Sequence, residues 1–188
     1  TSLLSEHLRS RQQVEKVLQM AQMDQRDFEL KISRVDMHEV IRQAVEHLSL
    51  QVQRREGHID MQLDAGRHIV EGDQTHLSNA IYNLLDNANK YSEHAPEIRV
   101  CTVNRAGGIE IVVEDKGIGM SKEDQKHIFD KFYRVHTGNV HDVKGFGLGL
   151  SYVKAIATAH QGSIDVKSEP GKGSKFFLFL PATQKGPK

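Results

Sequence analysis

Residues 76–91, HLSNAIYNLLDNANKY, form a helical pattern that contains four asparagines. Asparagine is a poor helix former, because its short amide competes for the hydrogen bonds of the backbone. Asn79, Asn83 and Asn87 recur every four residues and therefore line one face of the helix, which Lys90 extends. The opposite face is apolar and is formed by Ile81, Leu84, Leu85 and Ala88. A row of amide oxygens beside an ammonium suits a magnesium ion and its phosphates, although alone it also fits a solvated polar face.

The composition excludes several classes of protein. The 188 residues are enough for one domain and an appendage, and 25 basic residues balance 25 acidic ones. Because the net charge is zero, electrostatics gives no reason to expect that the chain binds nucleic acid or an anionic membrane. The single cysteine, Cys101, permits no internal disulfide and is predicted to be buried in the alternating pattern of residues 98–103. Apolar runs such as residues 176–180 are too short to span a bilayer.

The beginning of the chain reads as an appendage. It starts with Thr1 and carries no signal peptide, so we expect a piece of a longer protein. Residues 2–23 contain neither Gly nor Pro and carry apolar residues at helical spacing, which predicts one amphipathic helix from a bundle or coiled coil. The sequence therefore predicts an appendage over residues 1–27 and a domain over residues 28–188.

The rest of the chain alternates between helical and strand patterns. Helices are predicted over residues 37–54, where Asp36 is the N-cap, over residues 76–91, after Ser121 and over residues 148–160. Strands are predicted over residues 28–35, 59–63, 68–70, 98–104, 109–114, 163–168 and 175–180, and the last four form two hairpins. This order predicts a mixed α/β domain with a largely antiparallel sheet and helices on one face.

Two glycine clusters adjoin these elements. The first, DKGIG, places Asp115 directly after an apolar strand, where its carboxylate can accept a hydrogen bond inside a pocket that the glycines leave open. The second, GFGLG over residues 145–149, opens a helix, and bare amides at a helix start form a cradle for phosphate. It is not a Rossmann fingerprint, because position 150 is Leu and no buried strand precedes it, and no Walker loop occurs.

An aromatic segment, IFDKFYR over residues 128–134, lies between the glycine clusters. Phe129, Phe132 and Tyr133 are predicted to anchor it, so that it can close over a triphosphate together with Arg134. With this order of asparagine helix, DKGIG, aromatic segment and GFGLGL, the chain resembles the ATP-binding catalytic domain of bacterial sensor histidine kinases. Gyrase, the mismatch-repair ATPases and the heat-shock chaperones belong to the same wider class. The resemblance covers roughly residues 35–181 and implies a two-layer sandwich of the Bergerat type, preceded by a helix from a dimerisation hairpin.

The resemblance also implies roles for individual residues. Asn83 and Asn87 would bind Mg²⁺ and the phosphates of ATP, and Asp115 would accept a hydrogen bond from the adenine amino group. The residues that would act in phosphoryl transfer are Asn83, Lys90 and Arg134, of which Lys90 would also contact phosphate. The remaining nucleotide-binding residues would be Tyr91, Gly117, Ile118, Gly119, Phe132, Lys144, Gly145, Gly147, Leu148 and Gly149. Residues 136–146 would form a mobile lid.

The residue at position 83 bears on the reaction. Hydrolytic relatives typically carry a glutamate there that activates water, whereas the amide of Asn83 cannot take up a proton at neutral pH. The pattern therefore favours a kinase that transfers the terminal phosphoryl group to another nucleophile. Two alternatives stay open: a serine kinase or ATPase of the same superfamily that uses Asp86 as a base, and a nucleotide-sensing module without catalysis.

A histidine kinase also needs an acceptor imidazole, which the family carries in an H box on the first helix of its dimerisation hairpin. The nearest sequence, EHLRS around His7, lacks the acidic residue and the proline of that box, so residues 1–27 are predicted to be the second helix. The implied partners are a phosphoacceptor histidine domain of the same or a sister subunit, a response regulator, and a second copy in a full-length homodimer. The implied place is the cytoplasm, within a parent protein attached to the bacterial inner membrane. The remaining histidines, including His136 and His141, are too scattered to predict a zinc site.

Overall fold

The computed structural model describes residues 29–135 and 148–182. The chain divides into two compact units, Thr1–Leu30 and Lys31–Lys188, and the fold described below is that of the second unit. The helix predicted over residues 2–23, His7 and the polar segment before Leu148 lie outside the described residues. The division of the chain at residue 28 stays a prediction.

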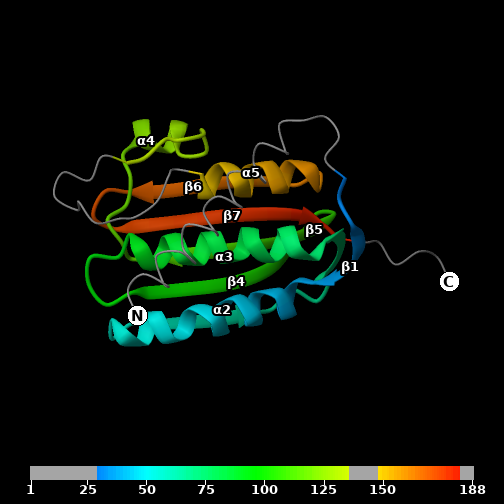
Figure 1. Ribbon diagram of the computed structural model, residues 1–188, viewed down its shortest axis with the longest axis horizontal. Helices are drawn as coiled ribbons and strands as arrows, with labels where there is room; N and C mark the ends of the chain where they lie inside the picture. The colour runs from blue at the N-terminus through cyan, green and yellow to red at the C-terminus, as the bar shows by residue number, and fades with distance from the viewer. Residues whose placement is uncertain (1–28, 136–147, 183–188) are drawn as a thin grey trace, which may run out of the picture. The chain divides into compact units, whose positions relative to one another are not determined.

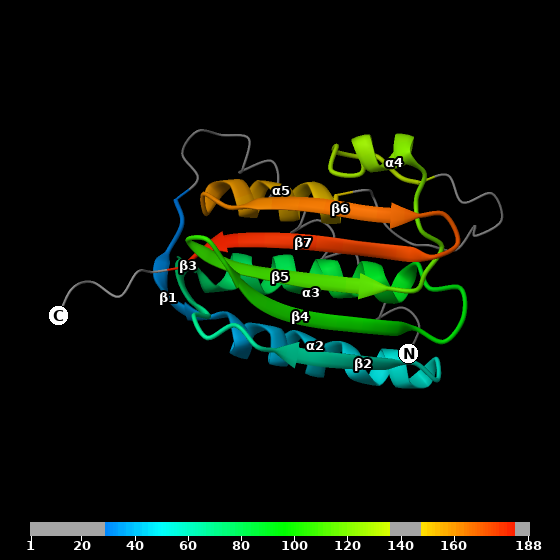
Figure 2. The same cartoon turned by 180° about the vertical axis from the view of Figure 1, so that it is seen from behind.

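The second unit is built on a five-stranded sheet, which lies in front of the helices in Figure 2. In the order of their hydrogen bonding, the strands are β2 (His58–Leu63), β4 (Glu97–Arg105), β5 (Gly108–Asp115), β7 (Gly173–Pro181) and β6 (Ser163–Glu169). In this sheet β2 and β4 run parallel, and the other neighbouring pairs are antiparallel. Both predicted hairpins, β4 with β5 and β6 with β7, are confirmed.

In the described part of the second unit, three helices cover one face of the sheet, namely α2 (Met37–Arg54), α3 (Gln74–Lys90) and α5 (Gly149–Ala159) (Figure 1). A short helix, α4 (Lys122–His127), lies beside β6. The largest fully buried side chains are Met37, Ile41, Leu48, Leu77, Ile81, Leu84, Leu85, Ile98, Ile109, Ile111, Ile156 and Leu178. They come from both layers, so the predicted α/β sandwich with a mostly antiparallel sheet is confirmed. Over the described residues, no helix is both long and apolar enough to cross a membrane.

Two helices start at the residues that the sequence indicates as caps. The Asp36 carboxylate accepts from the amides of His38 and Glu39 at 2.9 and 3.3 Å and so caps α2. Ser121 opens α4 with a capping box: its hydroxyl accepts from the Asp124 amide at 3.0 Å, and the Asp124 carboxylate accepts from the Ser121 amide at 3.3 Å. Local capping chemistry thus fixes where each of these helices begins.

Two further strands, β1 (Ile32–Asp36) and β3 (Ile69–Asp73), form a separate antiparallel sheet. The prediction of a strand over residues 28–35 is therefore wrong at its start. The cause lies in the partner strand, because β3 passes into α3 at Asp73, which is the N-cap of that helix. The amide of Lys31 donates to the Asp73 carboxylate at 2.9 Å instead of joining a ladder.

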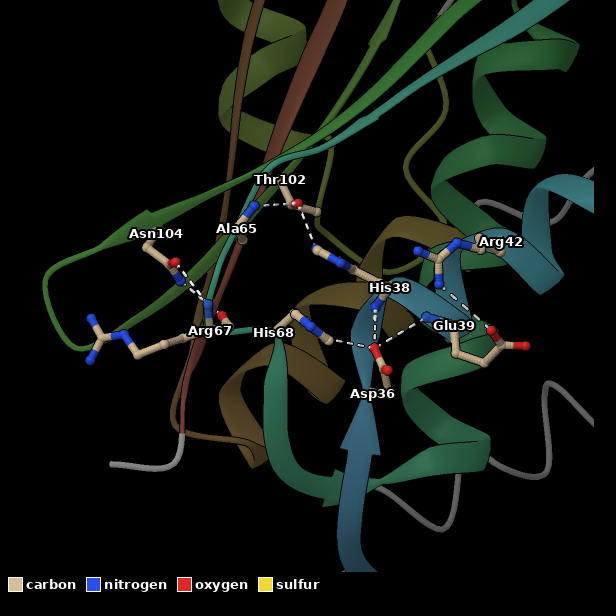
Figure 3. A network of polar contacts seen from close by, with 9 residues as sticks. All are labelled: Asp36, His38, Glu39, Arg42, Ala65, Arg67, His68, Thr102 and Asn104. Atoms are coloured by element: carbon tan, nitrogen blue, oxygen red, sulfur yellow. Dashed lines mark hydrogen bonds and ion pairs between the residues drawn. The ribbon is translucent and has the colours of Figure 1, made fainter. Parts of the chain in front are cut away.

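A polar network joins the start of α2 to β4 and to the chain before β3 (Figure 3). His38 Nε2 lies 2.9 Å from the Thr102 hydroxyl, which also accepts from the Ala65 amide at 3.2 Å. His68 Nδ1 lies 2.8 Å from the Asp36 carboxylate, and the rings of His38 and His68 stack with their centroids 4.0 Å apart. Burial lowers the pKa of His38, and the neighbouring His68 acts in the same direction. The network thus fixes the start of α2 against β4 and against the chain before β3.

Cys101 is half-exposed, so the prediction that it is buried is wrong. Its neighbours on β4, Val100 and Thr102, are fully buried beneath the helices. Because side chains alternate along a strand, Cys101 lies on the other face of the sheet, which carries no helix in the described part of the chain (Figure 2).

Candidate functional site

A pocket lies where the C-terminal end of α3, the end of β5 and the start of α5 meet. About 380 Å³ of space free of protein atoms lies within its outline, part of it open to solvent. Its lining combines residues predicted from the sequence with residues that were not, and consists of Asn87, Tyr91, Asp115, Ile118, Gly119, Met120, Ile128, Val135, Leu150, Ser174 and Phe176. The structure therefore brings the asparagine helix and the first glycine cluster to one place, as the sequence predicts.

Asp115 is the last residue of β5 and is only 6% exposed. Its Oδ1 accepts from the amide of Gly117 at 2.8 Å. Burial raises the pKa of Asp115 to about 6, although hydrogen bonds from the amides of Gly117 and Ser174 favour the carboxylate and oppose the shift. A buried acceptor in an otherwise largely apolar pocket is suited to one polar group of an apolar ligand.

Because burial raises the pKa of Asp115, the free energy of unfolding should depend on pH. The folded protein binds this proton at a higher pH than the unfolded chain, in which the pKa has its ordinary value of 3.8. The stability that protonated Asp115 contributes is therefore complete below about pH 3.8 and is lost as the pH rises through about 6. The shift from 3.8 to about 6 corresponds to roughly 3 kcal/mol.

Denaturant unfolding of the wild type and of Asp115→Asn, measured from about pH 4.5 to about pH 7.5, checks this dependence. Relative to the variant, the wild type should lose stability as the pH rises, because only the wild type must ionise a buried carboxyl. A difference between the two proteins that stays constant over this range would contradict the raised pKa of Asp115.

The backbone after β5 is held against the end of α3. The amide of Ile118 donates to the carbonyl oxygen of Tyr91 at 3.0 Å, and a Cβ on Gly117 would lie 2.4 Å from that same oxygen. Gly119 has a positive φ of 67°, and a Cβ there would lie 2.0 Å from the carbonyl oxygen of Glu169. Residues without side chains are therefore needed where this loop passes between α3 and the turn before β7.

The asparagine face of α3 reaches two parts of the site. Asn83 is 6% exposed, and its Nδ2 donates to the carbonyl oxygen of Asn79 at 2.8 Å. Its Oδ1 points toward the start of α5, since a Cβ on Gly149 would lie 3.2 Å from it. Asn87, one turn further along, lines the pocket with Asp115. The predicted stripe therefore extends from the second glycine cluster to the first.

Lys90 and Asp86 form an ion pair on α3, with 2.5 Å between Nζ and Oδ2. The side chain of Asp86 is 13% exposed and that of Lys90 is 40% exposed. Neither residue lines the pocket. The Asp86 carboxylate is therefore already paired with the ammonium group of Lys90.

The aromatic segment is anchored by two of the three predicted side chains. Phe129 packs edge-on against Phe176, with ring centroids 6.3 Å apart, and the Tyr133 hydroxyl donates to the Asp124 carboxylate at 2.7 Å. Phe132 is 69% exposed and has a φ of 63°, so the prediction that it is an anchor is wrong. The reason is local, because Phe132 lies in a turn after α4 and has a left-handed backbone conformation. Its nucleotide-binding role stays a prediction.

Several other predicted residues lie at or beyond the edge of the site. Arg134 is exposed and does not line the pocket. Leu148 is buried, and Gly149 after it is the first residue of α5. The proposed lid lies outside the described residues, as do Lys144, Gly145 and Gly147. The functions of these residues stay predictions.

The sequence did not indicate the apolar half of the pocket. This half is formed by Met120, Ile128, Val135, Leu150 and Phe176, with Ser174 beside Asp115. Leu150 and Phe176 belong to regular apolar patterns and are indistinguishable from core residues in the sequence. The register of the sheet explains why two of these residues reach the pocket. Strand β7 pairs with β5 so that Ser174 lies opposite Asp115 and Phe176 lies opposite Val113.

Comparison with known proteins agrees with this geometry. Residues 72–184 match the family described as histidine kinase-, DNA gyrase B-, and HSP90-like ATPase. Sensor protein RprX of Bacteroides fragilis is 46% identical over 175 residues, which are 92% of this chain and 34% of that protein. Sensor-like histidine kinase SenX3 of Mycobacterium tuberculosis is 38% identical over 149 residues, 79% of this chain and 36% of that protein. The chain spans about a third of the length of these curated relatives.

Solved structures share the fold. Full-length ShkA in complex with AMPPNP matches with a TM-score of 0.82 and 26% identity, over 97% of this chain and 37% of ShkA. The mycobacterial sensor histidine kinase MprB matches with a TM-score of 0.68 and 28% identity, over 80% of this chain and 97% of that one. Histidine kinase ThkA in complex with response regulator protein TrrA has a TM-score of 0.75 at 20% identity, over 96% and 49% of the two chains, which shows the fold alone.

The family match covers the asparagine helix, both glycine clusters and the pocket between them, and it confirms the resemblance that these motifs indicate. The chain belongs to the histidine kinase-, DNA gyrase B- and HSP90-like ATPase family.

Proposed function

We propose that this chain is the catalytic part of a sensor histidine kinase, which binds ATP with Mg²⁺ and donates the terminal phosphoryl group to a histidine. The observation that carries the proposal is Asp115, a buried carboxylate in a largely apolar pocket. The shape and chemistry of this pocket suit adenine. Its amino group can donate to the buried carboxylate, and its ring can pack against the apolar walls. Asn87 lines the same pocket. The phosphates would extend from adenine toward this residue.

The amide oxygens on the asparagine face of α3 are suitable ligands for a magnesium ion. Mg²⁺ prefers oxygen ligands, and both Asn83 and Asn87 can supply an amide oxygen. The nitrogen of Asn83 is engaged with the Asn79 carbonyl, which turns its oxygen toward the start of α5. A magnesium ion held there would neutralise charge on the phosphates, and the chain itself would position the nucleotide.

The same residues support transfer to a protein nucleophile over hydrolysis. Asn83 lies beside the start of α5, and its amide cannot act as a base. Asp86 is engaged by Lys90 at 2.5 Å and does not line the pocket. Water attack should therefore be slow, and ATP should persist until an acceptor histidine is presented. We assign Lys90 and Arg134 to contacts with the phosphates.

The activity belongs to a larger protein. We propose that residues 1–27 are the second helix of a dimerisation hairpin, and that the acceptor histidine lies on the same or a sister subunit of a homodimer. A response regulator would then take the phosphoryl group from that histidine. This part of the parent protein would work in the cytoplasm, with the parent attached to the inner membrane.

Asn87→Ala should weaken ATP binding about tenfold or more in the presence of magnesium, because one oxygen ligand is lost. In EDTA the same substitution should change the affinity little, since the ligand role requires the ion. Isothermal titration calorimetry of both proteins with and without magnesium measures the two losses. Equal losses in the two conditions would count against Asn87 as a magnesium ligand.

Transfer itself can be tested with labelled ATP, magnesium and a separate dimerisation domain that bears an H box. Acid-labile phosphate on the histidine of that domain is the expected product, and Asp115→Ala is the control that should give none. Rapid ATP hydrolysis that is abolished by Asp86→Asn would favour the ATPase alternative. Tight ATP binding with neither transfer nor hydrolysis would favour a nucleotide-sensing module.

A further inference from the structure

Arg55 places a guanidinium group at the C-terminal end of the asparagine helix. It is the first residue after α2, and its side chain reaches across to the last turn of α3. Nη1 donates to the backbone carbonyl of Asn89 and, at 3.0 Å, to the side-chain oxygen of Asn89. Nη2 donates to the carbonyl of Ser92 and, at 3.4 Å, to that of His94. One side chain thus serves acceptors of three residues at a helix end.

One of these acceptors, the Asn89 carbonyl, belongs to the last turn of α3, and the others lie beside it or in the chain that follows. The last carbonyls of a helix lack intrahelical donors, and the helix dipole makes this end negative. Asn89 and Ser92 are both 6% exposed, so water has little access to them. In residues 29–135 and 148–182, no ion pair of Arg55 with a carboxylate occurs, so its charge acts on the helix end.

The helix end that Arg55 holds is a wall of the pocket. Tyr91 lies between Asn89 and Ser92, and it lines the pocket. Its carbonyl oxygen accepts from the amide of Ile118 at 3.0 Å, and Ile118 follows Asp115 in the glycine cluster. A displacement of this turn would therefore move both Tyr91 and the loop beside Asp115.

The neighbouring backbone braces the same connection from its other end. The amide of His58 donates to the carbonyl oxygen of Pro96 at 2.8 Å. Residues 55–58 thus contact the segment between α3 and β4 near its beginning, through Arg55, and at its end, through Pro96. The chain after α2 fixes this segment although it contributes no residue to the pocket itself.

We infer that Arg55 is a positioning residue of the nucleotide site, which preforms the adenine end of the pocket by clamping the C-terminal end of α3. The inference rests on the proposed function, since it assumes that the pocket holds ATP. Arg55 acts through Tyr91 and Ile118 and does not itself touch the nucleotide. Its effect should therefore concern the base and be the same whether or not a terminal phosphate is present.

The experiment compares Arg55→Met, Arg55→Lys and the matched control Arg54→Met in the full chain. Arg54 is the last residue of α2, adjacent in sequence but exposed. Arg55→Met should raise the dissociation constants of ATP and ADP by the same factor, about tenfold. Arg55→Lys should recover part of the loss, because an ammonium keeps the charge but cannot serve all the acceptors that a guanidinium reaches. Arg54→Met should bind like the wild type.

A purely structural role predicts a different result. It would lower the melting temperature and leave both dissociation constants unchanged at temperatures where the variants are folded, and that outcome would overturn the inference. A loss confined to ATP would also overturn it, because it would place Arg55 at the terminal phosphate. If Arg55→Met does not fold, Arg55→Lys provides the test. This variant should weaken the binding of ATP and of ADP by the same factor and should shift the amide resonance of Ile118. Wild-type affinity for both nucleotides would refute the inference. If the wild type itself binds neither nucleotide, the proposed function fails instead.

Discussion

Replacing Asp115 with alanine should raise the dissociation constant of ATP about a hundredfold or more. Asp115 is 6% exposed, so the adenine amino group would lose this acceptor at a place where water has little access. Leaving a buried donor unpaired costs about 1–3 kcal/mol, and the cavity left by the side chain adds to this. Calorimetric titration with ATP, below the melting temperature of both proteins, measures the loss.

Glu114→Ala provides the matched control for Asp115→Ala. Glu114 is the preceding residue of β5, but its side chain lies on the opposite face of the strand, where it pairs with Lys175 at 2.9 Å. Removing this carboxylate should leave the affinity for ATP within about twofold of the wild type. Similar affinities for Asp115→Ala and Glu114→Ala would show that adenine does not contact Asp115.

Sequence periodicity was sufficient for the scaffold of this site. The interval of four between Asn79, Asn83 and Asn87 and the apolar residues opposite them predict both the helix and its buried face, and α3 has both. Asp115 was predicted at a strand end because a run of alternating residues stops there, and β5 ends at that residue. Patterns of this kind are local, so one sequence is enough to detect them.

Contacts between distant elements could not be predicted in this way. Ser174 and Phe176 reach the pocket only because β7 pairs with β5 in a particular register, and register is set by packing over the whole sheet. Arg55 carries no local signal, because basic residues are common at helix ends and its acceptors lie more than thirty residues away. The prediction that Cys101 is buried failed for a related reason. Alternating residues show that a strand has two faces, but they do not show which face is covered by helices.

The structural roles of the histidines could not be predicted from the sequence either. In the described part of the chain they do not gather into a cluster of metal ligands. His160 accepts from the Asp73 amide at 2.9 Å through Nε2 and lies 2.7 Å from the Ile156 carbonyl through Nδ1, an arrangement that suits a neutral ring. His76 lies 2.7 Å from the Tyr152 hydroxyl and so links α3 to α5. Such structural roles depend on tertiary contacts and leave no motif.

Gly119→Ala should destabilise the protein by about 3 kcal/mol and, in the folded fraction, weaken ATP binding about a hundredfold. Two effects add. The φ of 67° is costly for any residue with a Cβ, and that Cβ would lie 2.0 Å from the carbonyl oxygen of Glu169. Because that oxygen belongs to the backbone, the strain is relieved by moving the backbone at Glu169 or the chain between Ile118 and Met120, and the latter lines the pocket.

Gly107→Ala separates the two effects. Gly107 has a φ of 81° in the β4–β5 turn, and a Cβ there would have no heavy atom within 4 Å. This control should lose only the conformational term, about 1 kcal/mol, and should bind ATP like the wild type. Thermal unfolding and calorimetric titration of both variants measure the two quantities. If Gly119→Ala lost no more than Gly107→Ala in either measurement, the close approach of the glycine loop to the turn before β7 would not be needed for the site, and the pocket would have to be formed by other contacts.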